Sequence, residues 1–136
     1  MDVRHSTVSP FIEHGAVVVH PMVPKFTMRE ETMGGYLELV DVFEIAFGAD
    51  PIPHYHDTHE FFFILAGRPI IQIGAEARLV SVGDLVHVPR NAPHRIRATT
   101  AEGVRGLTFS ISYQTPYDPG YINCELPEVE MLEEVQ

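Results

Sequence analysis

One stretch, residues 48–67, constrains this chain more than any other and reads GADPIPHYHDTHEFFFILAG. Side chains two residues apart in a β-strand point to the same face, so His54 and His56 project together. Residues 57–58 are Asp and Thr, which favour turns, and a turn there brings Glu60 back to the same interior. Imidazoles and a carboxylate that converge from rigid strand ends are typical ligands of a divalent metal ion. The stretch therefore predicts a metal site.

A second segment, residues 83–94, carries the ligand that would complete this set. It reads GDLVHVPRNAPH and ends in His94. The two segments together resemble the two sequence motifs of the cupin superfamily, G-x5-H-x-H-x3-E-x6-G and G-x5-P-x-G-x2-H-x3-N. The first motif matches throughout, and the second matches at its first glycine, its proline and its histidine. It departs at Asn91, which tolerates a left-handed turn almost as glycine does, and at Ala98, which removes no ligand.

The resemblance covers about residues 36–113 and implies a small single-domain, all-β protein. Its expected fold is the double-stranded β-helix, the jelly-roll barrel of the cupins. It also implies one divalent metal ion bound by His54, His56, Glu60 and His94. These ligand types suit iron, which we favour, and also zinc, nickel, manganese and copper. A lone His-x-His is usually an ordinary strand pair, but here a spaced glutamate, bracketing glycines and a second matching segment accompany it.

Strand patterns along the rest of the chain agree with a jelly roll. Apolar and polar residues alternate in short segments separated by Gly and Pro: Ala16–His20, which Pro21 should stop, Tyr36–Phe47, Ile70–Ile73, Ala77–Val80, Leu85–Val88 and Val104–Tyr113. Asp41 falls on the apolar parity of its strand, where a buried carboxylate, a bulge and a strand break are all open interpretations. We divide the chain into an N-terminal arm and strand (1–35), a barrel (36–113) and an acidic tail (114–136) that could fold across a barrel mouth.

The strand that follows the turn has two different faces. Phe62 and Ile64 share the parity of Glu60, so we expect them to line an apolar substrate pocket. Phe61, Phe63 and Leu65 point the other way, and this outward apolar row predicts a homodimer. Several basic side chains are expected outside the set of ligands: His5 and His14, both in solvent, the strand-end His20, the outward His59 and His87, and Arg95 and Arg97, which should face away from the cavity.

Composition narrows the partners and the compartment. The formal net charge of −10 argues against binding to nucleic acid or to anionic membrane surfaces. The longest wholly apolar run, Phe61–Ala66, is far below the ~20 residues needed to cross a bilayer, and the N-terminus lacks the apolar core of a signal peptide. The single cysteine, Cys124, cannot form an internal disulfide. We expect a cytoplasmic protein whose partner is a small molecule.

The expected function is that of a metal-dependent enzyme on a small aromatic or enolisable molecule, most simply a dioxygenase. Phe62 stands two residues after Glu60, where it cannot take a proton, and only Tyr117 and Tyr121 are weak candidates for a base from the tail. A metal-bound enolate needs less from the protein if it reacts with oxygen. Two alternatives stay open. One is an isomerase, lyase or polyketide cyclase that does not use oxygen, and the other is a non-catalytic binding or sensing protein.

Overall fold

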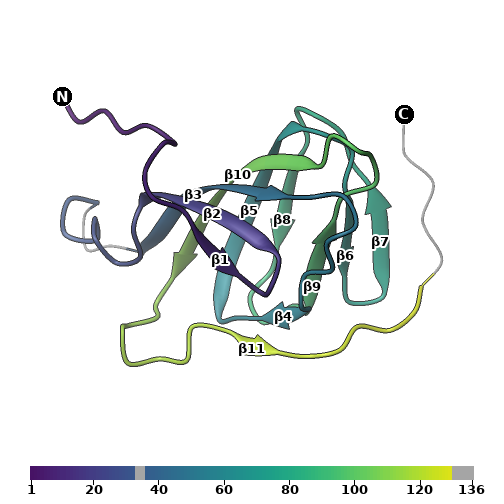
Figure 1. The fold of residues 1–136 in the computed structure, drawn as a ribbon. Coiled ribbons are helices and arrows are strands. Elements are labelled where there is room, and N and C mark those ends of the chain that lie inside the picture. The colour runs from purple at the N-terminus through teal and green to yellow at the C-terminus, as the bar shows by residue number, and fades with distance from the viewer. Residues whose placement is uncertain (33–35, 130–136) are drawn as a thin grey trace.

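Two antiparallel sheets face each other in the computed structural model, which describes residues 1–32 and 36–129 (Figure 1). One sheet has the strand order β1-β2-β3-β10-β5-β8 and the other has the order β11-β4-β9-β6-β7. The strands are β1 (Phe11–Glu13), β2 (Val17–Val23), β3 (Leu37–Ile45), β4 (His54–Tyr55), β5 (Thr58–Ala66), β6 (Ile70–Ile73), β7 (Glu76–Leu79), β8 (Leu85–Val88), β9 (His94–Arg97), β10 (Val104–Ser112) and β11 (Ile122–Asn123). This confirms the all-β, jelly-roll fold. Within the described ranges no helix is long and apolar enough to span a membrane.

The predicted strands are found close to their expected bounds, with one correction. β2 does not stop before Pro21 but continues through it to Val23. Strand β1 pairs only with Val17–Val19, so beyond that point one edge of β2 has no neighbouring strand. A proline is tolerated there because no ladder hydrogen bond is required of it. The register against β3 shifts between Pro21 and Val23, which places a bulge at the proline.

The alternation predicted for β5 is confirmed. Phe62 and Ile64 are buried between the sheets, whereas Phe63 and Leu65 keep 37% and 40% of their surface exposed on the outside. Phe61 lies on the same outer face, where its ring stacks on Phe109. The homodimer that we inferred from this row stays a prediction.

The inner face of β10 is built from small residues, which leaves room between the sheets. Gly106, Thr108, Ser110 and Ser112 all point inward and are buried. A Cβ at Gly106 would lie 2.4 Å from the ring of Phe43, so this ring occupies the space that a side chain would need. The larger residues of β10, which include Leu107 and Ile111, lie on the other face. The central strand therefore borders a cavity rather than filling the interior.

At two turn positions of the motif segments, the backbone conformation explains which residue is present. Gly67 has φ +89, and a Cβ there would lie 2.1 Å from the carbonyl oxygen of Gly103, so only glycine fits. Asn91 adopts φ 60, the left-handed turn that the substitution of Asn for the usual glycine predicted.

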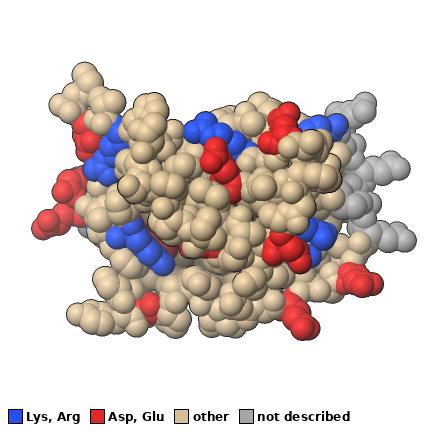
Figure 2. Space-filling model, in the orientation of Figure 1, with Lys and Arg blue, Asp and Glu red and all other residues tan. Residues whose placement is uncertain are grey.

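Both ends of the chain return to the barrel. The N-terminal β1–β2 hairpin lies alongside β3, and the tail passes along β4, with which β11 pairs at Ile122↔Tyr55 and Asn123↔His54 (Figure 1). The side-chain amide of Gln72 also donates to the carbonyl of Pro127. Residues 33–35 of the predicted arm and 130–136 of the predicted tail lie outside the described residues. On the face shown in Figure 2, acidic and basic side chains are interspersed among uncharged ones.

Candidate metal centre

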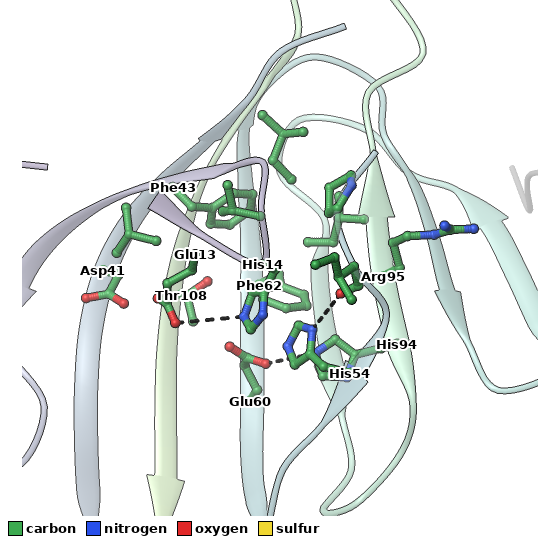
Figure 3. A pocket seen from close by; sticks show the side chains of 16 residues that line it. Glu13, His14, Asp41, Phe43, His54, Glu60, Phe62, His94, Arg95 and Thr108 are labelled. Atoms are coloured by element: carbon green, nitrogen blue, oxygen red, sulfur yellow. Dashed lines mark hydrogen bonds and ion pairs between the residues drawn. The ribbon is translucent and has the colours of Figure 1, made fainter. Parts of the chain in front are cut away.

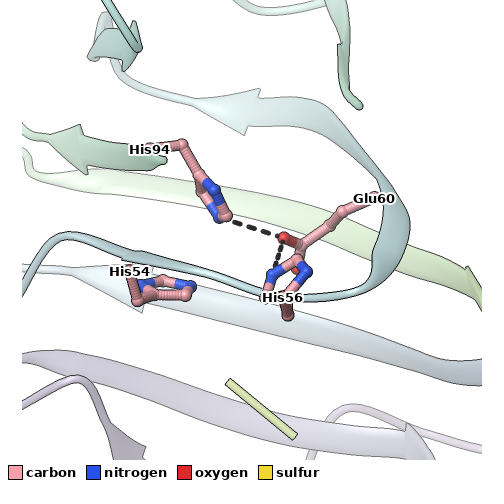
Figure 4. Close-up of side chains that lie close together, drawn as sticks. All are labelled: His54, His56, Glu60 and His94. Atoms are coloured by element: carbon pink, nitrogen blue, oxygen red, sulfur yellow. Dashed lines mark ion pairs between the residues drawn. The ribbon is translucent and has the colours of Figure 1, made fainter. Parts of the chain in front are cut away.

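Four side chains from separate parts of the chain meet where the two sheets come together. His54 is on β4, Glu60 on β5 and His94 on β9, while His56 lies in the connection between β4 and β5. One ligand atom from each lies within 4.8 Å of the others (Figure 4). His54 and His94 are direct register partners across β4 and β9. The structure thus brings together all of the residues that the sequence predicted as ligands.

Backbone carbonyls accept hydrogen bonds from two of the imidazoles and thereby set their tautomer. Nδ1 of His94 lies 2.9 Å from the carbonyl oxygen of Ala92, and Nδ1 of His54 lies 3.1 Å from that of Ile52. A carbonyl only accepts hydrogen bonds, so both Nδ1 atoms must carry the hydrogen. In the neutral rings the lone pair is therefore on Nε2, which is the tautomer that a metal requires.

The contacts of Glu60 indicate that a cation belongs in this site. Its Oε2 lies 2.8 Å from Nε2 of His56 and 3.2 Å from Nε2 of His94. Oε2 of Glu60 and Nε2 of His94 are buried, yet among the described residues neither has a hydrogen-bond partner of good geometry. A carboxylate oxygen facing an imidazole lone pair is unfavourable unless a proton or a metal ion lies between them. Three imidazoles and one carboxylate fit a divalent transition metal, which would leave coordination positions open to a ligand.

The electrostatics of the cluster favour the ligand forms of two of these groups. Burial opposes ionisation of Glu60, but its contacts with His56 and His94 outweigh burial and hold its pKa below the usual range. Burial, followed by the nearby His94, lowers the pKa of His54 to about 3. For His56, burial lowers the pKa, but the hydrogen bond and charge of Glu60 more than compensate and raise it. At neutral pH Glu60 is therefore ionised and His54 is neutral.

A cavity of about 70 Å³ opens beside the cluster (Figure 3). Its wall is mainly apolar and includes Phe43, Ile45 and Phe62, as we expected for Phe62. Ile64, which we placed in the same pocket, instead has no exposed surface and packs within the hydrophobic core. The correction follows from depth along the strand, because Ile64 lies one inward position farther from the cluster than Phe62.

Two carboxyl groups face this cavity together with the cluster. Asp41 is buried on β3, where it pairs in register with Thr108, so the open question about this residue resolves to a buried carboxylate. Burial, reinforced by Glu13 and Glu60, raises the pKa of Asp41 to about 7. Burial and then Glu60 also raise the pKa of Glu13. The cavity thus contains one carboxyl group, that of Asp41, that can hold a proton near neutral pH.

A second, more polar cavity of about 60 Å³ lies on another side of the cluster. Glu13, Asp41 and Glu60 border both cavities, and Lys25 and Glu38 border only this one. Lys25 Nζ lies 3.4 Å from Oε1 of Glu38. The cluster therefore lies between an apolar chamber and a charged one.

His14 is the clearest error of the sequence-based reading. We expected it in solvent, but its ring stacks on that of His54 with centroids 3.5 Å apart and planes 9° from parallel. Burial lowers the pKa of His14 to about 4. Tyr121, a weak candidate from the tail, approaches both rings by its edge. No sequence spacing links residues so far apart; only the hairpin and tail topology brings them together.

The remaining predicted positions fall outside the centre. Tyr117 is 98% exposed, so it is no candidate for a proton-transferring residue in this structure. His59 and His87 lie on the outer face, with Nδ1 of the first 2.8 Å from Nε2 of the second. Arg97 is exposed as expected, but Arg95 is half-buried in the cavity wall, where it pairs with Asp50 at 3.1 Å. His5 is exposed, and His20 pairs with Glu44.

Comparison with known proteins places this geometry in context. The profile of the family described as "Cupin domain" matches residues 41–110. An uncharacterized protein of Aquifex aeolicus is 33% identical over 63 residues, which are 46% of this chain and 52% of that protein. The chain therefore matches about half the length of this curated relative.

Solved structures share the fold at low sequence identity. A predicted oxalate decarboxylase of Thermotoga maritima has a TM-score of 0.70 at 18% identity, over 82% of this chain and 99% of the other. The polyketide cyclase RemF of Streptomyces resistomycificus has a TM-score of 0.69 at 20% identity, over 94% of this chain and 88% of the other. With a family match over just over half of the chain and all four motif ligands gathered between two jelly-roll sheets, the chain belongs to the cupin domain family.

Proposed function

We propose that this cupin is a metal-dependent enzyme that moves protons on a small, uncharged aromatic or enolisable molecule without consuming oxygen. The observation that carries the proposal is the position of Asp41 and Glu13 in the cavity that three of the four clustered residues, His54, Glu60 and His94, also line. The sequence-based preference for a dioxygenase rested on a pocket that offered no proton-transferring side chain. Asp41 supplies one, so an isomerase, lyase or cyclase becomes the better supported class.

The roles of the residues follow from their environment. His54, His56, Glu60 and His94 would hold the divalent ion, which would act as a Lewis acid and lower the pKa of a hydroxyl or enol bound to it. Asp41 is a buried carboxyl group in the same cavity, with a pKa that burial raises in the metal-free protein, and it can accept a proton from carbon or oxygen and return it elsewhere on the substrate. Phe43 and Phe62 would pack against an aromatic ring and exclude water from it.

The charge of the two cavities narrows the substrate class. Four carboxyl groups border them, from Glu13, Glu38, Asp41 and Glu60. Among the residues lining these cavities the basic ones are Lys25 and Arg95, and each is paired with an acidic residue. A small dicarboxylate such as oxalate would find no unpaired Lys or Arg among these lining residues to bind its second carboxylate, whereas a neutral polyketone or phenol needs none. The likeness in fold to a polyketide cyclase over most of the chain agrees with this choice.

A dioxygenase remains the second candidate because the apolar wall formed by Phe43, Ile45 and Phe62 would protect a reactive intermediate from water. With iron as the bound metal, this reading predicts oxygen consumption. The two candidates therefore differ in a directly measurable co-substrate.

The test compares turnover in air and under nitrogen. Protein without a histidine tag is analysed for metal and then incubated with a panel of β-polyketones, enols and catechols, while oxygen uptake and product mass are recorded. We expect equal rates in both atmospheres and a product with the mass of the substrate or that mass less water. Oxygen uptake with a matching gain in product mass would replace this proposal with the dioxygenase.

Asp41→Asn tests the proton-transfer role directly. We expect kcat to fall by about 100-fold while metal content is retained. Asp2→Asn, at an exposed carboxylate that pairs with Arg4 in the N-terminal arm, is the control and should leave kcat within about threefold of the parent. An Asp41→Asn variant with full activity would remove Asp41 from the mechanism.

A further inference from the structure

His54 is on the least supported strand of the metal centre. β4 contains only His54 and Tyr55, and its pairing with β9 consists of the single register pair His54↔His94. Glu60, by contrast, is on a nine-residue strand that pairs in long registers with β10 and β8. A ligand on so short an element needs other contacts to hold its ring in place.

Those contacts come from two segments that lie outside the family match over residues 41–110. From the N-terminal side, the carbonyl of His14 accepts a hydrogen bond from the backbone N–H of Ile52 at 2.9 Å. From the tail, the backbone N–H of Cys124 donates to the carbonyl of Pro53 at 2.9 Å. The two residues that precede His54 are therefore tied to both ends of the chain.

The side chains of the same two segments close on the His54 ring itself. His14 covers one face of it, with ring centroids 3.5 Å apart and planes only 9° from parallel. Tyr121 approaches by its edge at 5.8 Å, and it contacts His14 in the same way at 4.7 Å. The rings of His56 and His94 also lie close to that of His54, with centroids 5.3 Å and 4.4 Å away. Aromatic rings from the N-terminal hairpin, the tail and the metal cluster thus surround the ring of His54.

The backbone conformation of His14 indicates that this residue does more than support the fold. It adopts φ 52, in a left-handed region that non-glycine residues seldom use, at the turn of the β1–β2 hairpin just before Gly15. Glycine would suit this turn better, and the imidazole Nδ1 is buried without a hydrogen-bond partner in the part of the chain that the structure describes. What the histidine gains in return is the stack on His54.

We propose that His14 is a positioning residue of the metal centre, whose ring, supported by Tyr121, fixes the orientation in which His54 presents Nε2 to the metal. This inference rests on the proposed metal centre but not on the reaction. The N-terminal hairpin and the tail are then parts of the site. Changes there alter metal binding although neither segment supplies a ligand.

The test measures binding of Co²⁺ and Zn²⁺ to the full-length chain, with the visible absorption of the Co²⁺ form as a report of coordination geometry. Three variants separate the contributions: His14→Gly removes the ring and relieves the left-handed backbone, His14→Phe keeps a flat ring, and Tyr121→Ala removes the support. We expect His14→Gly to raise the Kd for metal by about 10-fold or more and to change the Co²⁺ spectrum. His14→Phe should keep the Kd within about threefold of the parent, and Tyr121→Ala should fall between the two.

Thermal unfolding of the metal-free variants distinguishes positioning from a structural role. Because glycine fits φ 52, we expect His14→Gly to leave the metal-free Tm equal or higher while metal binding weakens. His5→Gly, in the exposed part of the same arm, and Tyr117→Ala, in the exposed part of the tail, are the matched controls and should change neither quantity.

Three outcomes would overturn the inference. His14→Gly could bind metal with the parent's Kd and spectrum, His14→Phe could lose as much affinity as His14→Gly, or the loss of affinity could be matched by an equal loss of metal-free stability. A parent protein that binds neither ion would instead remove the proposed metal centre itself. Failure of this inference and failure of the proposed function are therefore distinguishable.

Discussion

Glu38 and Glu60 are both enclosed within the barrel, but their surroundings differ in kind. The Oε2 atom of Glu38 accepts hydrogen bonds from the hydroxyls of Thr58 and Ser112, and Gln114 in turn donates to Thr58. Oε2 of Glu60 faces imidazole nitrogens and has no hydrogen-bond partner of good geometry. The first group is satisfied by the protein alone, whereas the second is completed only by a cation.

This difference separates a structural buried charge from a binding site. The Glu38 network also takes in Arg29, which donates to the hydroxyl and carbonyl of Ser112 and to the carbonyl of Gln114. It thereby ties the segment after β2 to the end of β10. A buried carboxylate with all its partners present stabilises one conformation, and a buried carboxylate that lacks them indicates a missing ligand.

The largest expected effect is on metal binding by Glu60→Gln. The variant keeps the shape of the side chain but loses its charge, and we expect the Kd for Zn²⁺ to rise by about 1,000-fold, equivalent to ~4 kcal/mol. Replacing His54, His56 or His94 by Ala should likewise deplete the metal and leave a folded barrel. Competition titration against a chromogenic chelator measures the Kd.

Glu38→Gln is the matched control for that experiment. Glu38 borders the neighbouring cavity but is not one of the four clustered ligands. The Kd of the Glu38→Gln variant for Zn²⁺ should therefore stay within about 10-fold of that of the parent. If the two glutamine variants lost metal equally, the distinction between the two glutamates would fail.

Glu60 matters more than Glu38 for metal binding, but Glu38 should matter more than Glu60 for the stability of the metal-free protein. We expect Glu38→Ala to lower the free energy of unfolding of the metal-free protein by ~3 kcal/mol, because the hydroxyls of Thr58 and Ser112 lose their acceptor. Glu60→Ala should cost less than ~1 kcal/mol, because its removal also ends the burial of an incompletely satisfied charge. Urea denaturation in the presence of a chelator measures both.

Glu44→Ala provides the reference for a β3 glutamate at the surface. Its carboxylate is 46% exposed and pairs with His20, so its loss should cost ~0.5 kcal/mol. A Glu60→Ala variant less stable than Glu38→Ala would show that the metal-free cluster is itself a structural network.

The sequence predicted the Glu60 cluster and missed the Glu38 network for a physical reason. Metal ligands on adjacent strands must obey the strand period, so their spacing is visible in the chain. Simple alternation along β3 puts Glu38 on the face opposite to Leu37 and Leu39. The register against β10, however, runs from Leu37↔Ile111 to Leu39↔Ser110 and leaves Glu38 as an extra residue. This bulge turns the side chain of Glu38 inward, and no residue pattern in the sequence predicts the bulge.

Sequence patterns show contacts between near neighbours and not between distant residues, and this explains which residues around the cavity were predicted correctly. The strands of the barrel and the burial of Phe62 followed from alternation, which depends only on near neighbours. The placements of His14 and Arg95 depend on where a hairpin and a loop dock, and these are contacts between distant residues. The tail was considered as a cover for a barrel mouth, but its pairing with β4 could not be read from its two-residue strand.

A smaller effect concerns pH and the cation that Glu60 requires. In the metal-free protein Glu60 raises the pKa of His56 above its unfolded value of 6.5. The contact between protonated His56 and Glu60 therefore stabilises the fold fully below pH 6.5, and this stabilisation is lost as pH rises through the raised pKa. We expect the metal-free parent to lose ~1 kcal/mol more stability between pH 6 and pH 8.5 than Glu60→Gln does. Urea denaturation at both pH values, with Zn²⁺ present in a parallel series, measures the difference.

Zn²⁺ should reverse this slope in the parent, since the metal replaces the proton and binds more tightly as the histidines deprotonate. The ionisation of Asp41 also lowers stability as pH rises between 3.8 and about 7, and because Glu60 helps to raise the pKa of Asp41, this contribution differs between the parent and Glu60→Gln. Both proteins are therefore compared in an Asp41→Asn background. Identical slopes in parent and Glu60→Gln would show that no proton bridges the cluster.

The smallest effect tests whether Glu38 needs a cation at all. Lys25 lies 3.4 Å from Glu38, but its side chain is 38% exposed, so water competes for both groups and Lys25→Met should cost only ~0.5 kcal/mol. Arg29→Met should cost clearly more, because Arg29 holds the Ser112 and Gln114 carbonyls from a half-buried position. If Lys25→Met instead destabilised the protein as much as Glu38→Ala, the hydroxyls would not be sufficient for Glu38. The two glutamates would then share a need for a positive charge, which in one case the chain supplies from Lys25 and in the other it must take from solution.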